Sequence, residues 1–157
     1  MLAHARLVPA RRTLTLSVAL NESLPVPTGW ADFAIEGWSF GHATGWNPEG
    51  WRVELTTALD EMRRVTRPGG AMILLETLGT GSTEPAPPNA ALADLYRWFE
   101  EQHGFSRESI RTDYQFADVD EADHLTRFFF GDDLAGRLRR ENLTRLPECT
   151  GIWHRRA

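Results

Sequence analysis

A nearly continuous apolar run at residues 71–78 sets the strongest limit on how this chain folds. A run with so few polar positions predicts a strand covered on both faces, as in parallel sheets. The preceding Pro68-Gly69-Gly70 ends any helix before it. That helix is indicated by an apolar stripe at helical spacing, which consists of Trp51, Leu55, Leu59, Met62 and Val65. A helix that leads directly into a buried strand is typical of α/β sheets.

The rest of the chain continues this alternation of strands and helices. Strands are predicted at residues 13–20, 31–38, 110–116 and 150–155, with period-two alternation in the segments 13–20 and 110–116. Helical spacing and capping residues predict helices at residues 47–65, 89–103, 119–129 and 134–141. Segments rich in glycine or proline predict loops at residues 21–29, 37–45 and 79–88. Together they predict a mainly parallel sheet with helices on its faces, in which ligands bind beyond the carboxyl ends of the strands.

Length and charge exclude several classes of protein. The chain has 157 residues, which fits one domain, and its formal net charge is −5. Nucleic-acid binding depends on clustered cations, so we do not expect this chain to bind nucleic acid. The sequence has no run of about 18 apolar residues, so we expect no membrane span. A single cysteine cannot form an internal disulfide, and we expect a cytoplasmic protein.

The N-terminus has two interpretations. Arg6, Arg11 and Arg12 precede an apolar segment, an arrangement that also occurs in secretory and transit peptides. Polar residues at every second position of segment 13–20 favour a half-buried strand instead. We therefore divide the chain into an N-terminal extension, residues 1–12, and one α/β domain, residues 13–157.

Four stretches together resemble class I S-adenosylmethionine-dependent methyltransferases. They are Asn-Glu-Ser-Leu-Pro-Val at 21–26, Trp-Ala-Asp-Phe-Ala-Ile at 30–35, Glu-Met-Arg-Arg-Val at 61–65 and Arg-Pro-Gly-Gly at 67–70. The resemblance covers residues 20–78, and the order of the later elements fits the C-terminal half of the family. It implies a partial Rossmann-like methyltransferase sheet, mostly parallel with an antiparallel C-terminal strand, and with helices on the faces.

The sequence departs from the family at its start. The family begins with a strand and a glycine-rich turn that binds the carboxypropyl end of the cofactor, and this motif does not precede residue 20 here. Gly79-Thr80-Gly81 follows the wrong strand to replace it. The acidic residue that often lies beside the adenine in the family is matched by Leu20. We therefore expect a truncated methyltransferase-like domain that binds S-adenosylmethionine weakly or not at all on its own.

The resemblance implies a cofactor site in the loops that follow the strands. Asn21, Glu22 and Ser23 match the loop that contacts the adenine edge, although such residues are also common in simple turns. Trp38 and Ser39 match the segment beneath the methionine part of the cofactor. An aromatic face there would stabilise the sulfonium cation, but packing in the core is equally expected of Trp38.

Two residues are candidate catalytic bases, each with a structural alternative. His42 is the one histidine in a predicted ligand loop, and its ordinary pKa suits proton transfer near neutral pH. Glu76 ends the apolar strand, where a carboxylate should point into a cleft or find a partner. The histidines are not spaced as metal ligands, so no metal site is predicted.

These observations lead to two hypotheses. The first is methyl transfer from S-adenosylmethionine to a small-molecule acceptor, in which alignment of the nucleophile supplies most of the rate. The second is a non-catalytic remnant or partner-binding module that has lost the cofactor site. In both, only segment 13–20 is available to cover the outer side of strand 31–38. We therefore expect a homodimer, or a partner chain that covers the open sheet edge.

Overall fold

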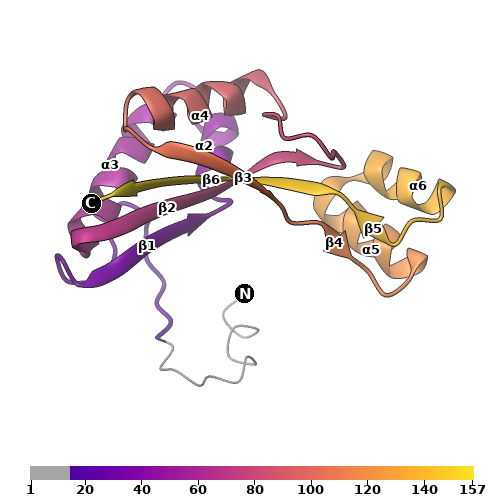
Figure 1. Ribbon diagram of the computed structural model, residues 1–157, viewed down its shortest axis with the longest axis horizontal. Helices are drawn as coiled ribbons and strands as arrows, with labels where there is room; N and C mark the ends of the chain where they lie inside the picture. Colours follow the sequence, from indigo (N-terminus) through magenta and orange to yellow (C-terminus); the bar gives the residue numbers. More distant parts are fainter. Residues whose placement is uncertain (1–14) are drawn as a thin grey trace.

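Residues 15–157 are described by a computed structural model (Figure 1). Its strands are β1 (Ala31–Gly37), β2 (Thr66–Thr80), β3 (Ser106–Arg111), β4 (Tyr114–Gln115), β5 (Arg145–Leu146) and β6 (Glu148–Arg156). Its helices are α2 (Phe40–Trp46), α3 (Trp51–Val65), α4 (Ala90–Glu101), α5 (Val119–Phe130) and α6 (Asp132–Arg140). Across residues 15–157, no helix is long and apolar enough to cross a membrane. The predicted extension at residues 1–12 lies outside the described part.

Four strands form the main sheet, in the order β1-β2-β6-β3. β1 and β2 pair in parallel, whereas β6 is antiparallel to both of its neighbours, β2 and β3. Three strands therefore run in one direction and the C-terminal strand β6 runs in the other, which confirms the predicted sheet. The carboxyl ends of β1, β2 and β3 consequently lie at the same border of the sheet, where α/β folds bind ligands.

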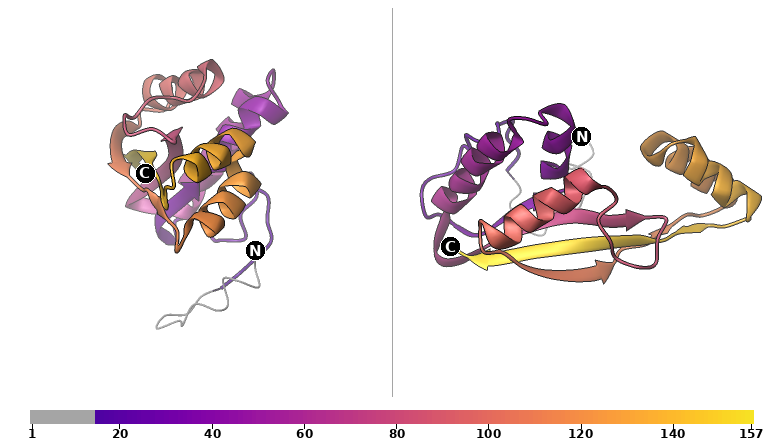
Figure 2. Two further views of the ribbon diagram at one scale, coloured as in Figure 1. Left: turned by 90° about the vertical axis from the view of Figure 1, so that its right-hand side faces the viewer. Right: turned by 90° about the horizontal axis from the view of Figure 1, so that it is seen from above.

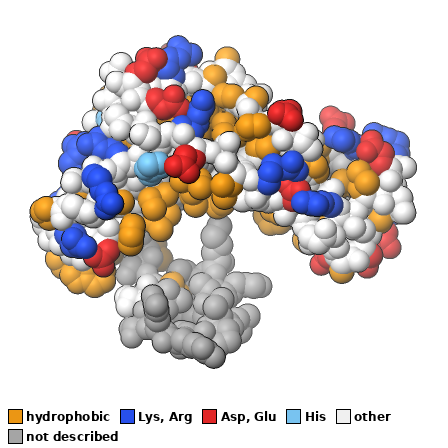
Figure 3. Space-filling view, in the orientation of Figure 1, with side chains coloured by type: hydrophobic (Ala, Val, Ile, Leu, Met, Phe, Trp, Pro, Cys, Tyr) orange, Lys and Arg blue, Asp and Glu red, His pale blue; other side chains and the backbone are white. Residues whose placement is uncertain are grey.

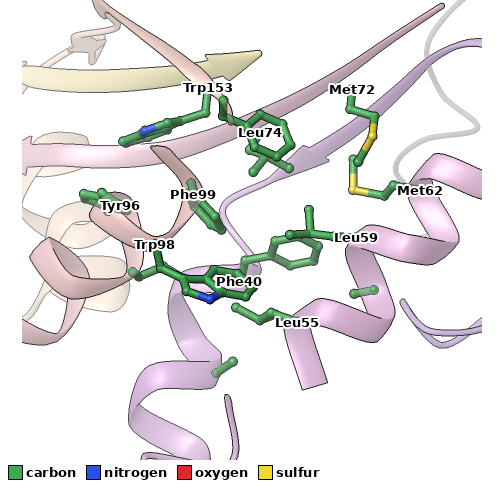
Figure 4. Packing of buried hydrophobic residues seen from close by; sticks show 14 of the residues in the cluster. Phe40, Leu55, Leu59, Met62, Met72, Leu74, Tyr96, Trp98, Phe99 and Trp153 are labelled. Carbon is green, nitrogen blue, oxygen red and sulfur yellow. The ribbon is translucent and has the colours of Figure 1, made fainter. Parts of the chain in front are cut away.

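The core lies between the sheet and the helices α2, α3 and α4, which cover one face (Figures 1 and 2). The predicted apolar stripe of α3 is buried against this face. From α4, the ring of Tyr96 lies 4.5 Å from that of Trp153 in β6 (Figure 4). Met72 and Leu74 of β2 complete the cluster. These contacts join elements that are far apart in the sequence into one layer.

The opposite face of the sheet carries apolar side chains that no described helix covers. This open face contains Phe33, Ile35, Ile73, Leu75 and Ile152. Phe33 and Ile35 are 60% and 62% exposed, and Figure 3 shows hydrophobic side chains along the lower side of the sheet. The prediction that the strand at 71–78 is covered on both faces is therefore wrong for the described residues. The apolar run does form a strand, β2, but the side chains on the open face of this strand are only half-buried.

The prediction of a strand at residues 13–20 is also wrong for residues 15–20. Residues 15–19 have no regular structure, and Leu20 makes only an isolated bridge to Ser23. Residues 13 and 14 lie outside the described part. The alternating pattern finds no strand to pair with, so β1 is an edge strand among residues 15–157. The following loop packs on α3 instead, where Arg64 donates a hydrogen bond to the carbonyl of Leu24.

Three other boundaries differ from those predicted. The glycine-rich segment 37–45 is not a simple turn, because it contains most of α2. α3 begins at Trp51, since Asn47 forms a hydrogen-bonded turn before it. The predicted strand 110–116 is divided into β3 and β4, which belong to different sheets and are separated at Asp113.

A smaller lobe contains α5, α6 and the two-stranded sheet β4-β5, and it has an apolar cluster of its own. Asp118 caps the start of α5, because its side chain accepts a hydrogen bond from the N–H of Glu121. The loop after β2 joins the lobe at Gly81, which has a φ of +80°. A Cβ at this glycine would lie only 2.7 Å from the side chain of Leu134 in α6. The close approach fixes the lobe to the end of β2.

The packing at Gly151 of β6 gives the first prediction. A Cβ at this position would lie 2.4 Å from the ring of the buried Trp153, so Gly151→Ala has to displace that ring. We expect a loss of about 2–3 kcal/mol in the free energy of unfolding, measured by urea denaturation. The matched control is Gly45→Ala in α2, where no atom lies within 4 Å and a helix favours alanine. Equal stability of the two variants would contradict the tight packing at Trp153.

Candidate functional site

Two buried carboxylates, Glu36 and Glu76, lie near the carboxyl ends of β1 and β2. We call them the acidic pair. Glu36 is paired in register with the buried Leu74, and both carboxylates face the side of the sheet that the helices cover. They are only 7% and 3% exposed. Burial of a carboxylate costs several kcal/mol unless it is hydrogen-bonded or neutralised, so their partners determine the state of the site.

Glu36 holds the first turn of α2. Its Oε1 accepts hydrogen bonds from the N–H of Ser39 at 2.6 Å, the hydroxyl of Ser39 at 2.9 Å and the N–H of Phe40 at 3.2 Å. Its Oε2 is buried and has no hydrogen-bond partner among residues 15–157. Desolvation raises the pKa of Glu36 above its usual value, although the hydrogen bonds to Ser39 and Phe40 act in the opposite direction and lower it. One oxygen is therefore occupied by α2, while the other has no hydrogen-bond partner among the described residues.

Glu76 contacts the same turn from the neighbouring strand. Its Oε1 accepts a hydrogen bond from the N–H of Gly41 at 2.7 Å. Burial, together with the nearby charge of Glu36, raises the pKa of Glu76 to about 8. A side chain at position 41 would not fit, because its Cβ would lie 2.9 Å from Oε2 of Glu76. Glu76 is thus mainly protonated at neutral pH and is held against the backbone of α2.

Close to the acidic pair, Tyr96 and Thr77 form a separate hydrogen-bonded chain that ends at a third buried carboxylate, Glu148. The hydroxyl of Tyr96 donates to the carbonyl of Thr77 at 2.7 Å, and the hydroxyl of Thr77 donates to Oε1 of Glu148 at 2.7 Å. Burial raises the pKa of Tyr96, and the charges of Glu76, Glu36 and Glu148 raise it further. Tyr96 therefore stays neutral and acts as a hydrogen-bond donor in this network.

A groove of about 390 Å³ runs beside β1, and we call it the edge groove. Its walls come from the loop that contains Asn21, from β1 and its following turn, and from α3. Apolar residues such as Leu24 and Met62 form much of this lining. Glu36 is the one ionisable residue among its described lining residues. The edge groove thus combines an apolar wall with a single buried carboxylate.

The structure brings two of the five predicted cofactor-binding residues to the edge groove, namely Asn21 and Ser39. Glu22, Ser23 and Trp38 are their chain neighbours and are exposed, but they do not line it. Trp38 has a φ of +53°, in the left-handed region that residues other than glycine rarely adopt. The backbone is therefore strained at the point where β1 ends and the groove begins.

The two predicted catalytic bases have different environments. Glu76 is buried in the acidic pair and does not line the edge groove. His42 is exposed on α2, where its ring stacks on that of Trp46 with 4.9 Å between the centroids. Their roles stay predictions. Among residues 15–157, no group of three or more His, Cys, Asp or Glu side chains is placed to hold a metal ion.

Glu36 is not among the site residues that the sequence predicts. In β1, Ala34 and Glu36 are buried, whereas the larger apolar residues Phe33 and Ile35 lie on the open face. The usable signal was the position of Glu36 directly before Gly37, at the end of an apolar strand, which parallels that of Glu76.

Comparisons with known proteins support the fold. No known family profile matches the sequence, and no curated protein matches it. A candidate type II methyltransferase from Anaeromyxobacter dehalogenans aligns with 97% of this chain and 76% of its own, with a TM-score of 0.54 and 18% identity. A candidate methyltransferase from Bacillus halodurans aligns more loosely, with a TM-score of 0.43, 13% identity, and 87% and 68% of the two chains covered. The [4+2]-cyclase SpnF has a TM-score of 0.43 and 16% identity, with 89% and 55% covered.

The Anaeromyxobacter protein is only 18% identical to this chain, so its similarity shows a shared fold and nothing about function. The chain therefore has the fold of S-adenosylmethionine-dependent methyltransferases.

The raised pKa of Glu76 predicts how stability depends on pH. Its carboxyl titrates near pH 8 in the folded protein and near its usual value of 4.5 when unfolded. The folded state thus binds more protons between these values, so stability falls as the pH rises from about 5 to 9. The loss amounts to at most about 5 kcal/mol and should be largely absent in Glu76→Gln. Urea unfolding at several pH values measures it.

Glu84→Gln changes an exposed acid and serves as the control, which should keep the pH dependence of the parent. An identical pH profile for Glu76→Gln and the parent protein would contradict this assignment.

Proposed function

We propose that this chain is a methyltransferase-type domain that transfers a methyl group from S-adenosylmethionine to a small-molecule acceptor in the cytoplasm. The observation that carries the proposal is the buried carboxylate of Glu36 in the edge groove, with one oxygen that the described residues leave without a partner. A buried acceptor without a donor requires an explanation, and a ligand that brings a donor or a cation supplies one.

S-adenosylmethionine fits this donor set. Its sulfonium and ammonium groups are cationic and its ribose hydroxyls are donors, so each can satisfy Oε2 of Glu36. The faces of its adenine ring suit the apolar wall that contains Leu24 and Val26. Asn21 and Ser39 would hold it together with Glu36. When bound, the cofactor supplies a methyl group activated by the positive sulfur.

An acceptor whose nucleophile carries a proton would require a base. Glu76 holds its own proton below about pH 8, so it can accept another group's proton only in alkaline solution. His42 is exposed on α2, and its imidazole is the alternative base. Because the thioether is a good leaving group, alignment of acceptor and methyl group should contribute more to the rate than either base.

Binding of S-adenosylmethionine to the full chain tests the proposal. NMR spectra of ¹⁵N-labelled protein detect even weak binding, and we expect perturbations at residues 21–23 and 36–41. Glu36→Gln should weaken binding at least about tenfold, because the amide oxygen preserves the hydrogen bonds to α2 while the negative charge is lost. Trp38→Ala and His42→Ala should also weaken binding while leaving the fold intact.

Glu84→Gln again provides a matched control, because this exposed acid does not line the edge groove. Perturbations confined to other surfaces, or equal affinities of Glu36→Gln and Glu84→Gln, would contradict the proposed site.

The open face favours a second candidate function, that of a partner-binding module without catalysis. Phe33 and Ile35 are largely exposed on β1, which is also an edge strand of the described sheet. Unpaired edge strands and apolar patches are surfaces on which another chain can pair and pack. Such a function would need the sheet but not the acidic pair.

Self-association tests this candidate. We expect the purified protein to sediment as a dimer or larger species at about 50 μM, the scale at which exposed apolar surface drives association. Ile35→Lys should shift it to monomer, because a charge on the open face cannot be buried without cost. Val53→Lys, which replaces an exposed residue of α3, is the matched control and should leave association unchanged. A parent protein that is monomeric at every concentration would contradict the prediction.

A further inference from the structure

A second pocket, of about 400 Å³, lies between the sheet and the smaller lobe, and we call it the arginine pocket. Its apolar wall is formed by Leu134, Leu138, Leu143, Leu146 and Pro147. Its polar wall has three arginines and one acid, namely Arg111, Arg137, Arg145 and Asp113. Arg111 is the last residue of β3, so the pocket lies at the same border of the sheet as the acidic pair.

The hydrogen-bond capacity of Asp113 is taken up by the protein itself. Its Oδ1 accepts from Nε of Arg111 at 2.9 Å and from the N–H of Glu148 at 3.1 Å. Its Oδ2 accepts from Nη2 of Arg111 at 3.0 Å and from Nε of Arg145 at 2.6 Å. The backbone donor of Glu148, followed by the two guanidinium groups, holds the pKa of Asp113 below its usual value. One ionised carboxylate therefore balances only one of two arginines.

The arginines retain donors that the described residues do not use. Neither Nη of Arg145 has a hydrogen-bond partner within residues 15–157, and the same is true of Nη1 of Arg111. Arg137 reaches the carbonyl of Gly81 at 3.3 Å and the carboxylate of Glu141 at 3.4 Å, both longer than a good hydrogen bond. The pocket thus holds unbalanced positive charge beside an apolar wall.

Two lining residues of the pocket, Pro147 and Leu134, are held in place by contacts with Gly81. The N–H of Gly81 donates to the carbonyl of Pro147 at 2.7 Å, which joins the loop after β2 to the start of β6. The same glycine packs directly on Leu134 of α6. A pocket held in this way does not have to form when a ligand arrives, which lowers the entropic cost of binding.

We propose that the arginine pocket binds a small amphipathic anion. The oxyanion, a carboxylate or a phosphate, contacts the guanidinium groups of Arg137 and Arg145, which suit such groups in geometry and charge. A short aliphatic chain lies on the leucine wall. Binding of this anion does not depend on methyl transfer, whereas its identification as the methyl acceptor would rest on the function proposed above.

The experiment uses defined probes on the full chain without cofactor. Octanoate and octyl phosphate test the two oxyanions, octylammonium tests the sign of the charge, and acetate tests the contribution of the aliphatic chain. Methyl NMR spectra report on the leucine wall. We expect octanoate or octyl phosphate to perturb the methyl groups of Leu134, Leu138, Leu143 and Leu146, and octylammonium and acetate to bind at least about tenfold more weakly.

Variants test the role of the arginines. Arg137→Gln and Arg145→Gln should each weaken binding of the anionic probes about five- to tenfold. Arg137 does not contact Asp113, so its variant remains informative if Arg145→Gln disturbs the fold. Arg139→Gln is the matched control on α6, because this side chain pairs with Asp120 and Asp123 instead of lining the pocket.

Two outcomes would overturn the proposal. One is the absence of leucine perturbations with both anionic probes. The other is equal binding by Arg137→Gln, Arg145→Gln and Arg139→Gln, which would show that the charge of the pocket does not attract the ligand.

Discussion

The contact of two buried carboxylates with one short helical turn determines the arrangement of the sheet border. Glu36 and Glu76 come from neighbouring parallel strands, yet both accept hydrogen bonds from the first residues of α2. These bonds place α2 over the ends of β1 and β2 and let Phe40 enter the core. Mutual repulsion and burial keep one of the two protonated at neutral pH, so the pair can remain buried without a protein cation beside it. A stable helix start and a buried acceptor without a partner among the described residues are thus consequences of the same interaction.

The hydrophobic core lies on only one face of the main sheet, and any function proposed for the chain has to account for the uncovered face. The helices cover a single face, while Phe33 and Ile35 on the other face remain in contact with water. Exposed apolar surface of this kind does not stabilise the monomer, so it favours association with another polypeptide. Catalysis and partner binding would share part of β1, because Phe33 and Ile35 of the open face also line the edge groove, whereas the acidic pair points to the helical side. Substitution of Glu36 therefore separates the two candidate functions, since Glu36 does not lie on the open face.

The sequence predicted correctly those helices and strands whose pattern reflects local packing. Its predictions were wrong where a segment depends on partners that are distant in the sequence. The stripe of α3 follows the helical period and was confirmed, and the apolar run at residues 71–78 was confirmed as a strand, although one of its faces is only half-buried. Segment 13–20 has a strand-like alternation, but an alternating segment becomes a strand only if a neighbour accepts its hydrogen bonds. Glu36 was missed for a related reason. The larger hydrophobic residues of β1 lie on the outer face, an inversion that residue types alone do not reveal.

The acidic pair and the arginine pocket lie at one border of the sheet but act as separate sites for small ligands. The two sites have different side chains, because neither Glu36 nor Glu76 lines the arginine pocket. A failure of anion binding and a failure of cofactor binding therefore have different causes. A single molecule that contacted both sites would need an anionic end at Arg145 and a neutral or cationic end toward Glu36, because like charges in either position would repel each other.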